Sequence, residues 1–224
     1  MLTSCSPLSK QRNEYLRVYT EASLQAQRQD SLKKMLLFLH TKYPRWLTPY
    51  NIAQLLYQNP YMTPEVVGEY FTSQDDKYFN VDQFNQLRTA YTNLIDLSGM
   101  PFVAALRYYL TSAGFRMPGE GQKVDRTVTA FCQTYMRDNP DEFPDLDVAI
   151  LTCFATIMLN TELHNPNTLE LQKQQKKGKK GKPPMTVVEF VKNVKNTGKA
   201  GGRLDPQLLV SIFLEISGQA IEWA

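Results

Sequence analysis

FRMPGEGQKVDRTVTAFCQTYMRDNP, residues 115–140, is the stretch that most clearly indicates the fold. Its Pro118-Gly119 pair ends one helix, because proline and glycine both fit a helix interior badly. A second helix is expected from about Gly119 to Arg137, since Asn139-Pro140 cannot continue it. The stretch therefore predicts a helix, a break and another helix, with Glu120 at the start of the second.

Capping residues mark further helix starts on both sides of this stretch. Thr48-Pro49, Thr63-Pro64 and Asp205-Pro206 each place a capping side chain before a proline in the first helical turn. Thr186, with Glu189 three residues later, matches a capping box. These four positions are predicted N-termini of helices.

Apolar residues recur at three- and four-residue spacing in several segments, as they do on one face of a helix. The clearest stripes are Leu32-Met35-Leu36-Leu39, Ile52-Leu55-Leu56 and Phe102-Ala105-Leu106-Tyr109-Leu110. A helix is also expected over Asp147–Leu163, before Asn165-Pro166. No segment shows the two-residue alternation of a hairpin strand. The sequence predicts an all-α fold of about ten short helices.

Composition indicates a globular chain with one unusual segment. Apolar residues make up 42% and charged residues 21% of 224 residues, the usage of ordinary soluble proteins. The simplest organisation is one domain over residues 30–224, preceded by residues 1–29 as a leading helix or partly mobile arm. A lysine-rich surface loop is expected at residues 168–185, because KQQKKGKKGKPP at 173–184 has no apolar residue to bury.

The same lysines account for the net charge of +3, since the rest of the chain carries 19 basic and 22 acidic residues. They are Lys173, Lys176, Lys177, Lys179, Lys180 and Lys182. They form either a solvated linker or a contact with an anionic membrane surface. Nucleic-acid binding is not expected, because no aromatic residue for base stacking is interleaved with them.

Other features favour the cytoplasm and argue against a metal or redox site. No apolar run approaches the roughly 20 residues that span a bilayer, and the N-terminus does not resemble a signal peptide. Cys5, Cys132 and Cys153 are too few for a disulfide framework, and the latter two are expected to be buried free thiols. With His40 and His164 as the only histidines, neither a zinc site nor a Cys/His nucleophile pair is expected.

Two segments carry candidate functional residues. At the first, Glu120 is favoured by the helix dipole, so simple helix capping is the alternative to a functional role. The second is FATIMLNTELHNP, residues 154–166, an apolar helix with a polar end. Phe154, Ile157 and Met158 share one face of it, which fits either a binding surface or the core.

These segments, in this order and about two helices apart, resemble the paired signature of the Sec-seven domain, the exchange module of Arf guanine-nucleotide exchange factors. FRMPGEGQKVDR is similar to the family pattern F-R-L-P-G-E-A-Q-K-I-D-R, and IMLNTELHNP is similar to I-M-L-N-T-D-L-H-N-P. VVGEYF at residues 66–71 and MTVVEFVKN at 185–193 also resemble family helices.

The resemblance implies an elongated, right-handed helical superhelix with a hydrophobic groove that grips the switch regions of an Arf-family small GTPase. Glu120 takes the position of the catalytic glutamic finger, which enters the nucleotide site. Such a protein exchanges nucleotide without covalent chemistry and is expected to be monomeric and cytoplasmic, recruited to membranes in vesicle traffic. No cofactor or metal of its own is implied, because GDP, GTP and magnesium belong to the GTPase.

The same resemblance assigns partner-binding roles to six more residues. Phe154, Ile157 and Met158 are expected to line the groove, with Asn165 at its rim and Lys123 and Asp125 beside the finger. Gly121 replaces the usual alanine, which implies a looser finger, and Phe154-Ala155 resembles the brefeldin-resistant branch. The alternatives are a non-exchanging Arf-binding module and a membrane-associated helical scaffold; retention of Glu120 argues against the first.

Overall fold

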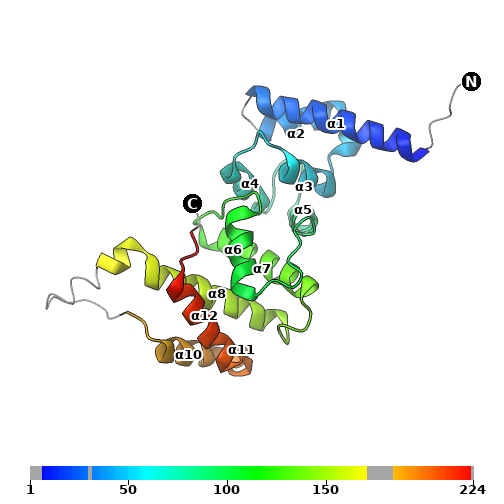
Figure 1. Cartoon of the computed structure of the whole chain (residues 1–224). Helices are drawn as coiled ribbons and strands as arrows, with labels where there is room; N and C mark the ends of the chain where they lie inside the picture. The colour runs from blue at the N-terminus through cyan, green and yellow to red at the C-terminus, as the bar shows by residue number, and fades with distance from the viewer. Residues whose placement is uncertain (1–6, 30–31, 171–183, 223–224) are drawn as a thin grey trace, which may run out of the picture. The chain divides into compact units, whose positions relative to one another are not determined.

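The computed structural model describes residues 7–29, 32–170 and 184–222, and these ranges contain helices but no β-strand (Figure 1). The all-α prediction is confirmed for this part of the chain. The chain divides into two compact units. Unit 1 comprises Met1–Ile95 and Ala113–Lys123; unit 2 comprises Asp96–Ser112 and Val124–Ala224. The predicted boundary near residue 30 stays a prediction.

Unit 1 begins with a long helix that packs on a shorter one. α1 (Pro7–Gln29) contacts α2 (Leu32–Lys42). On α1 the residues Val18, Ala22 and Ala26 are buried, and their four-residue spacing places them on one face. The predicted stripe from Leu32 to Leu39 is buried on α2.

Unit 1 continues with a short 3₁₀ turn η1 (Pro44–Trp46), then α3 (Pro49–Gln58), α4 (Pro64–Phe71) and α5 (Val81–Thr92). Two of these helices, α3 and α4, start where the Thr-Pro pairs predict. The side chains of Thr48 and Thr63 accept hydrogen bonds from the backbone N–H groups of Asn51 and Val66. Asn80 and Gln83 form a capping box on α5, which was not predicted.

The core of unit 1 is aromatic where α4, α5 and the segment from Ala113 meet. The Phe71 ring lies 5.1 Å from Tyr91 and 5.0 Å from Phe115, measured between ring centroids. The Tyr91 hydroxyl donates a hydrogen bond of 2.8 Å to the carbonyl of Ala113, and burial raises its pKa above the ordinary value. Gly114, with φ of 81°, makes the turn that this arrangement requires.

Unit 2 contains one helix that precedes Glu120 in the sequence, the two helices that flank residues 139–145 and the helices that follow them. Its elements are α6 (Phe102–Ser112), α7 (Gly121–Asp138, of which the first three residues belong to unit 1), α8 (Leu146–His164), α10 (Val187–Lys195), α11 (Gly198–Arg203) and α12 (Pro206–Gly218). The predicted N-caps Asp205 and Thr186 are both present, the latter with its capping box.

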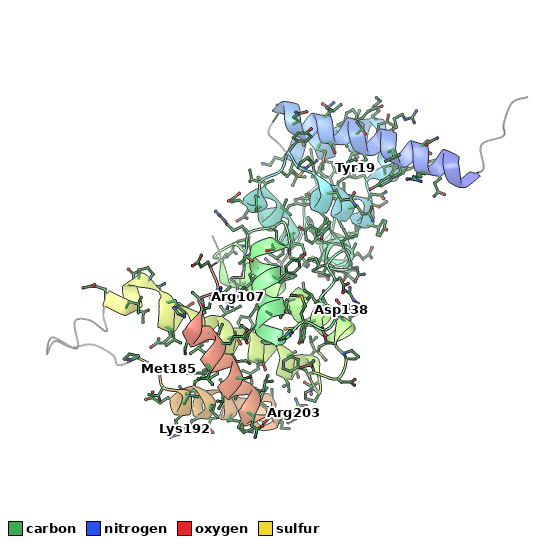
Figure 2. The ribbon with its side chains drawn as sticks, viewed as in Figure 1. Tyr19, Arg107, Asp138, Met185, Lys192 and Arg203 are labelled. Carbon is green, nitrogen blue, oxygen red and sulfur yellow. The ribbon has the colours of Figure 1, made fainter. Side chains whose placement is uncertain are left out.

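The C-terminal end of α7 confirms the predicted stop at Asn139-Pro140. The carboxylate of Asp138, labelled in Figure 2, accepts a hydrogen bond of 2.9 Å from the Leu97 N–H. The side-chain oxygen of Asn139 accepts one of 2.8 Å from the Gly99 N–H. These bonds join the end of α7 to the residues before α6.

An aromatic cluster forms the core of unit 2. The Phe102 ring lies 5.7 Å from Phe131, 5.4 Å from Tyr135 and 5.1 Å from Phe143. Cys132 and Cys153 are buried free thiols, as predicted. Burial, with the neighbouring Cys132, raises the pKa of Cys153 well above its ordinary value, which keeps this thiol protonated.

The chain after α12 is tied back to unit 2 by side chains of α6 and α8. Arg107 of α6 donates to the carbonyls of Ala220 and Gln219, the latter at 3.0 Å (Figure 2). Buried Asn160 accepts a bond of 2.7 Å from the Ile221 N–H and donates one of 3.2 Å to its carbonyl. His164 lies 2.6 Å from the carbonyl of Ile216. Two of the polar groups at the end of α8 are therefore used within the fold.

α8 and the lysine-rich segment bear on the two predictions about membranes, namely that no segment spans a bilayer and that a lysine loop contacts one. α8 is long and apolar enough to cross a bilayer by length and composition alone, so the prediction that no segment approaches this length is wrong. The core helices of soluble proteins pass the same test. Its contacts with α10, α11 and α12 are those of a packed helix. Residues 166–170 are helical, and all six lysines of the predicted surface loop lie outside the described residues.

Replacing Asn160 by alanine is expected to destabilise the chain by about 2–3 kcal/mol, because two buried backbone groups of Ile221 lose their partner. Urea unfolding measures this change. Thr161→Ala is the control, since exposed Thr161 bonds only to the carbonyl one turn earlier and its loss should stay below about 0.5 kcal/mol. Equal unfolding free energies for Asn160→Ala and the native chain would contradict the structural role of Asn160.

Candidate functional site

The segment that leads to Glu120 is fixed on α4 by its first two residues. Phe115 is buried against Phe71 and Tyr91. The backbone N–H of Arg116 donates a hydrogen bond of 2.7 Å to the carbonyl of Pro64, in the first turn of α4. The chain is therefore held at Phe115 and at Arg116 before it reaches Pro118-Gly119. The prediction that Pro118-Gly119 ends a helix is wrong, because the preceding helix ends at Ser112 and residues 115–118 are not helical.

This attachment requires a glycine on α4. A Cβ at Gly68 would lie 1.8 Å from the carbonyl oxygen of Arg116 and 2.9 Å from its carbon, far inside contact distance. Both atoms belong to the backbone, so neither can rotate away. Gly68 thus lets the main chain at Arg116 lie directly on α4.

Glu120 is placed at the start of α7 with its side chain exposed. Its carbonyl accepts a hydrogen bond of 2.9 Å from the Lys123 N–H, the first bond of the helix, and α7 itself begins at Gly121. The predicted helix start is therefore confirmed to within two residues. The Glu120 side chain is 59% exposed, and its Oε2 lies 3.3 Å from Nζ of Lys123.

Lys123 joins Glu120 to α4. Its Nζ lies 2.5 Å from Oε2 of Glu69, and only 22% of the Lys123 side chain is exposed. Glu69 first, and Glu120 second, raise the pKa of Lys123 above its ordinary value. Unit 1 therefore carries a carboxylate–ammonium–carboxylate cluster at the start of α7, of which the sequence predicted two members, Glu120 and Lys123, and not the third.

Unit 2 has an apolar groove between α8 and α10, with a volume of about 310 Å³. It is lined by Leu151, Phe154, Ala155, Met158, Leu159, Glu162, Met185, Phe190, Asn193, Val194 and Thr197. Two of the predicted groove residues, Phe154 and Met158, are among them, and Met158 is 69% exposed. The side of the groove formed by α10 was not predicted, although the spacing of Val187, Phe190 and Val194 indicates that this helix has an apolar face.

The remaining predicted residues lie apart from this groove within unit 2. Ile157 is half-buried on α8 and does not line it. Asn165 is the C-cap of α8, and its side-chain oxygen accepts a hydrogen bond of 2.9 Å from the Asn167 N–H. Asp125 is exposed on α7. Their partner-binding roles stay predictions.

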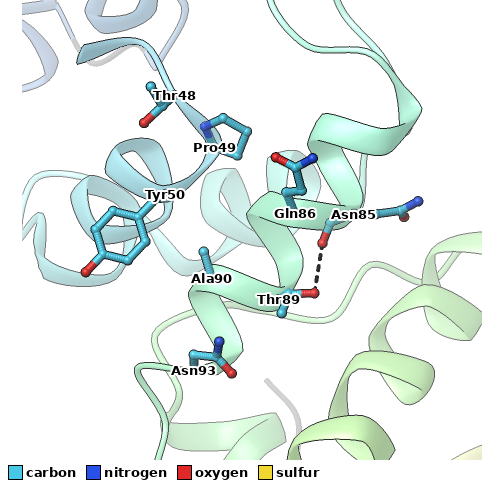
Figure 3. A pocket seen from close by; sticks show the side chains of 8 residues that line it. All are labelled: Thr48, Pro49, Tyr50, Asn85, Gln86, Thr89, Ala90 and Asn93. Carbon is cyan, nitrogen blue, oxygen red and sulfur yellow. Dashed lines mark hydrogen bonds between the residues drawn. The ribbon is translucent and has the colours of Figure 1, made fainter. Parts of the chain in front are cut away.

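A wider hollow of about 530 Å³ lies in unit 1 between α3 and α5 (Figure 3). Thr48, Tyr50, Asn85, Gln86 and Asn93 contribute polar groups to it, and Thr89 is bonded to the carbonyl of its own helix at Asn85. Neither candidate motif contributes a residue. In the described ranges, no three His, Cys, Asp or Glu side chains are grouped so as to hold a metal ion.

The sequence model of the Sec7 domain matches residues 21–221, which includes both motifs and nearly the whole chain. The chain belongs to the Sec7 domain family. The predicted membership of the Sec-seven domain family is thereby confirmed.

Relatives of this Sec7 domain include two larger proteins. Over 120 residues it is 39% identical to cytohesin-3 of Rattus norvegicus, an alignment that covers 54% of this chain and 28% of cytohesin-3. Over 121 residues it is 40% identical to brefeldin A-inhibited guanine nucleotide-exchange protein 1 of Mus musculus, covering 53% of this chain and 6% of that protein. The chain therefore matches less than a third of the length of either relative.

Solved structures agree with this assignment. The catalytic domain of Sec7p is 30% identical with a TM-score of 0.65, and the match covers 90% of this chain and 94% of that one. A structure of ARF1-GDP bound to a Sec7 domain complexed with brefeldin A matches with a TM-score of 0.65 over 96% of this chain and 97% of that one. At 23% identity this second match shows the fold alone.

Replacing Gly68 by alanine is expected to destabilise this Sec7 domain by about 1–3 kcal/mol, because the new Cβ displaces the main chain at Arg116. Urea unfolding measures the loss of stability, and the backbone amide shifts of residues 115–117, 119 and 120 measure the displacement. Gly121→Ala is the matched control. No atom lies within 4 Å of its added Cβ, so alanine should stabilise the first turn of α7 by about 0.5–1 kcal/mol. Unchanged stability and amide shifts in Gly68→Ala would contradict the contact.

Proposed function

We propose that this Sec7 domain stimulates the release of GDP from an Arf-family small GTPase, with Glu120 entering the nucleotide site as the catalytic group. The observation that supports this role is the exposed carboxylate of Glu120 at the start of α7, on a segment fixed to α4 by Phe115 and Arg116. Membership of the Sec7 family and the similarity to a guanine nucleotide-exchange protein support the same activity.

The chemistry of Glu120 is electrostatic. A carboxylate placed beside the β-phosphate of GDP repels it, competes for the lysine that binds it and takes the place of the magnesium ion. No covalent bond forms, and the chain supplies no cofactor. Because the carboxylate is exposed and attached to a fixed segment, little reorganisation is needed to present it.

The groove between α8 and α10 is proposed to bind apolar side chains of the GTPase. Met158 is exposed along it and Phe154 is half-buried, so burial of their remaining surface would supply binding energy. Exchange follows if this surface binds the nucleotide-free GTPase more tightly than the GDP-bound form. Ile157, Asn165, Lys123 and Asp125 are proposed as further contacts at or beside the two motifs.

Two other functions remain alternatives, each with its own signature. A module that binds an Arf-family GTPase without exchange would retain the groove and would not need Glu120. A helical scaffold on membranes would use the lysine-rich segment, and its binding would weaken with salt in the absence of any GTPase. Recruitment of a cytoplasmic protein to membranes, and a role in vesicle traffic, belong to the proposal.

The proposed role of Glu120 predicts that Glu120→Lys and Glu120→Gln each slow nucleotide release by about a hundredfold or more, as removal of one catalytic electrostatic group does elsewhere. The assay follows a fluorescent GDP analogue on a soluble Arf-family GTPase with excess GTP. Glu142→Gln, a change of the same kind at an exposed glutamate of unit 2, is the control for lost charge. Native rates in both Glu120 variants would contradict the catalytic role; no acceleration by the native chain would favour the non-exchanging module.

The proposed groove predicts that Met158→Ala weakens binding of the nucleotide-free GTPase by roughly 1–2 kcal/mol, because an exposed apolar anchor is lost. Calorimetry or surface plasmon resonance measures the dissociation constant. Leu214→Ala is the matched control, since Leu214 is 64% exposed on α12 of the same unit and does not line the groove. Equal weakening by both substitutions would argue against the groove as the binding surface.

A further inference from the structure

Three charged side chains of unit 1 share one contact at the start of α7. Nζ of Lys123 lies 2.5 Å from Glu69 and 3.3 Å from Glu120, so one ammonium group faces two carboxylates. Glu69 has the shorter contact. The two carboxylates are similarly exposed, at 58% and 59%, while Lys123 between them is mostly covered.

The proposed exchange reaction requires Glu120 to leave this cluster. A carboxylate that occupies the phosphate or magnesium position of a GTPase can no longer neutralise Lys123. If Glu120 were the main partner of Lys123, its departure would remove that counter-charge from the ammonium group. That would favour the state in which the finger stays on Lys123.

Glu69 is placed to prevent this. It follows Gly68 on α4, the helix on which the Arg116 main chain lies, so its position is set by the fold and not by the finger. We propose that Glu69 is a positioning residue for exchange: it holds Lys123 on α4 and so leaves the Glu120 carboxylate available to the nucleotide site. This inference rests on the proposed function.

The exchange assay tests this role with Glu69→Gln, which keeps the shape of the side chain and removes its charge. Nucleotide release should slow roughly two- to fivefold, the scale of an exposed ion pair, and the difference should shrink as salt is raised. In a Lys123→Gln background the same Glu69 substitution should have no further effect. Glu69→Asp, which keeps the charge, should recover part of the native rate.

Glu65→Gln is the matched control. Glu65 lies one turn earlier on α4, is similarly exposed at 47%, and pairs with the Arg116 side chain at 2.7 Å. Its substitution removes the same charge from the same helix and does not touch Lys123. The exchange rate should therefore stay at the native value, with thermal unfolding used to check that all variants are folded.

A second measurement needs no GTPase. Carbon NMR at Cε of Lys123 follows its titration, and Glu69→Gln should lower its pKa more than Glu120→Gln does, because Glu69 is the larger cause of the raised pKa. A larger effect of Glu120→Gln would overturn the inference whatever the exchange assay shows. It would confirm that the finger, and not α4, is the main partner of Lys123.

The outcomes separate this inference from the function on which it rests. If the native chain accelerates release and Glu69→Gln is as fast, the positioning role is wrong and the exchange function stands. The role is also wrong if Glu69→Gln slows exchange equally in the Lys123→Gln background, since Glu69 would then act on the GTPase directly. If the native chain accelerates no Arf-family GTPase, the proposed function fails and the positioning role fails with it.

Discussion

The close approach of the Arg116 main chain to Gly68 is the contact on which the placement of Glu120 depends. Because α4 has no side chain at this point, the backbone of the incoming segment lies directly on the helix and bonds to Pro64. Phe115 fills the aromatic core just before the contact. Only Met117, Pro118 and Gly119 then separate a fixed anchor from Glu120, so the carboxylate is presented by a short segment with few conformations to lose.

α8 shows how one helix serves two surfaces within unit 2. Ala149, Cys153 and Thr156 are buried on one side, whereas Phe154 and Met158 face the groove that α10 completes. Both sides are apolar, which is why the helix resembles a membrane span in composition and why its apolar residues alone could not be divided between core and groove. The second wall, from α10, decides which of them stay exposed.

Much of the secondary structure could be predicted because its signals are local. The Thr-Pro and Asp-Pro pairs, the capping box at Thr186 and the stop at Asn139 each depend on residues a few positions apart. The helix start beside Glu120 is of the same kind, and the family resemblance supplied its proposed role. Glu69, Gly68 and Phe190 were missed as parts of the candidate sites, because each acts through residues distant in sequence. Capping and spacing patterns carry no information about such contacts.

The two buried thiols of unit 2 can be used to measure how often this Sec7 domain opens locally. Cys132 and Cys153 are buried, and the raised pKa of Cys153 keeps it in the unreactive thiol form. A water-soluble alkylating reagent can reach them only when α7 and α8 separate from their neighbours, so the rate of their modification measures how often that part of the domain opens. In a chain whose Cys5 has been replaced, mass spectrometry would read that frequency without any engineered label.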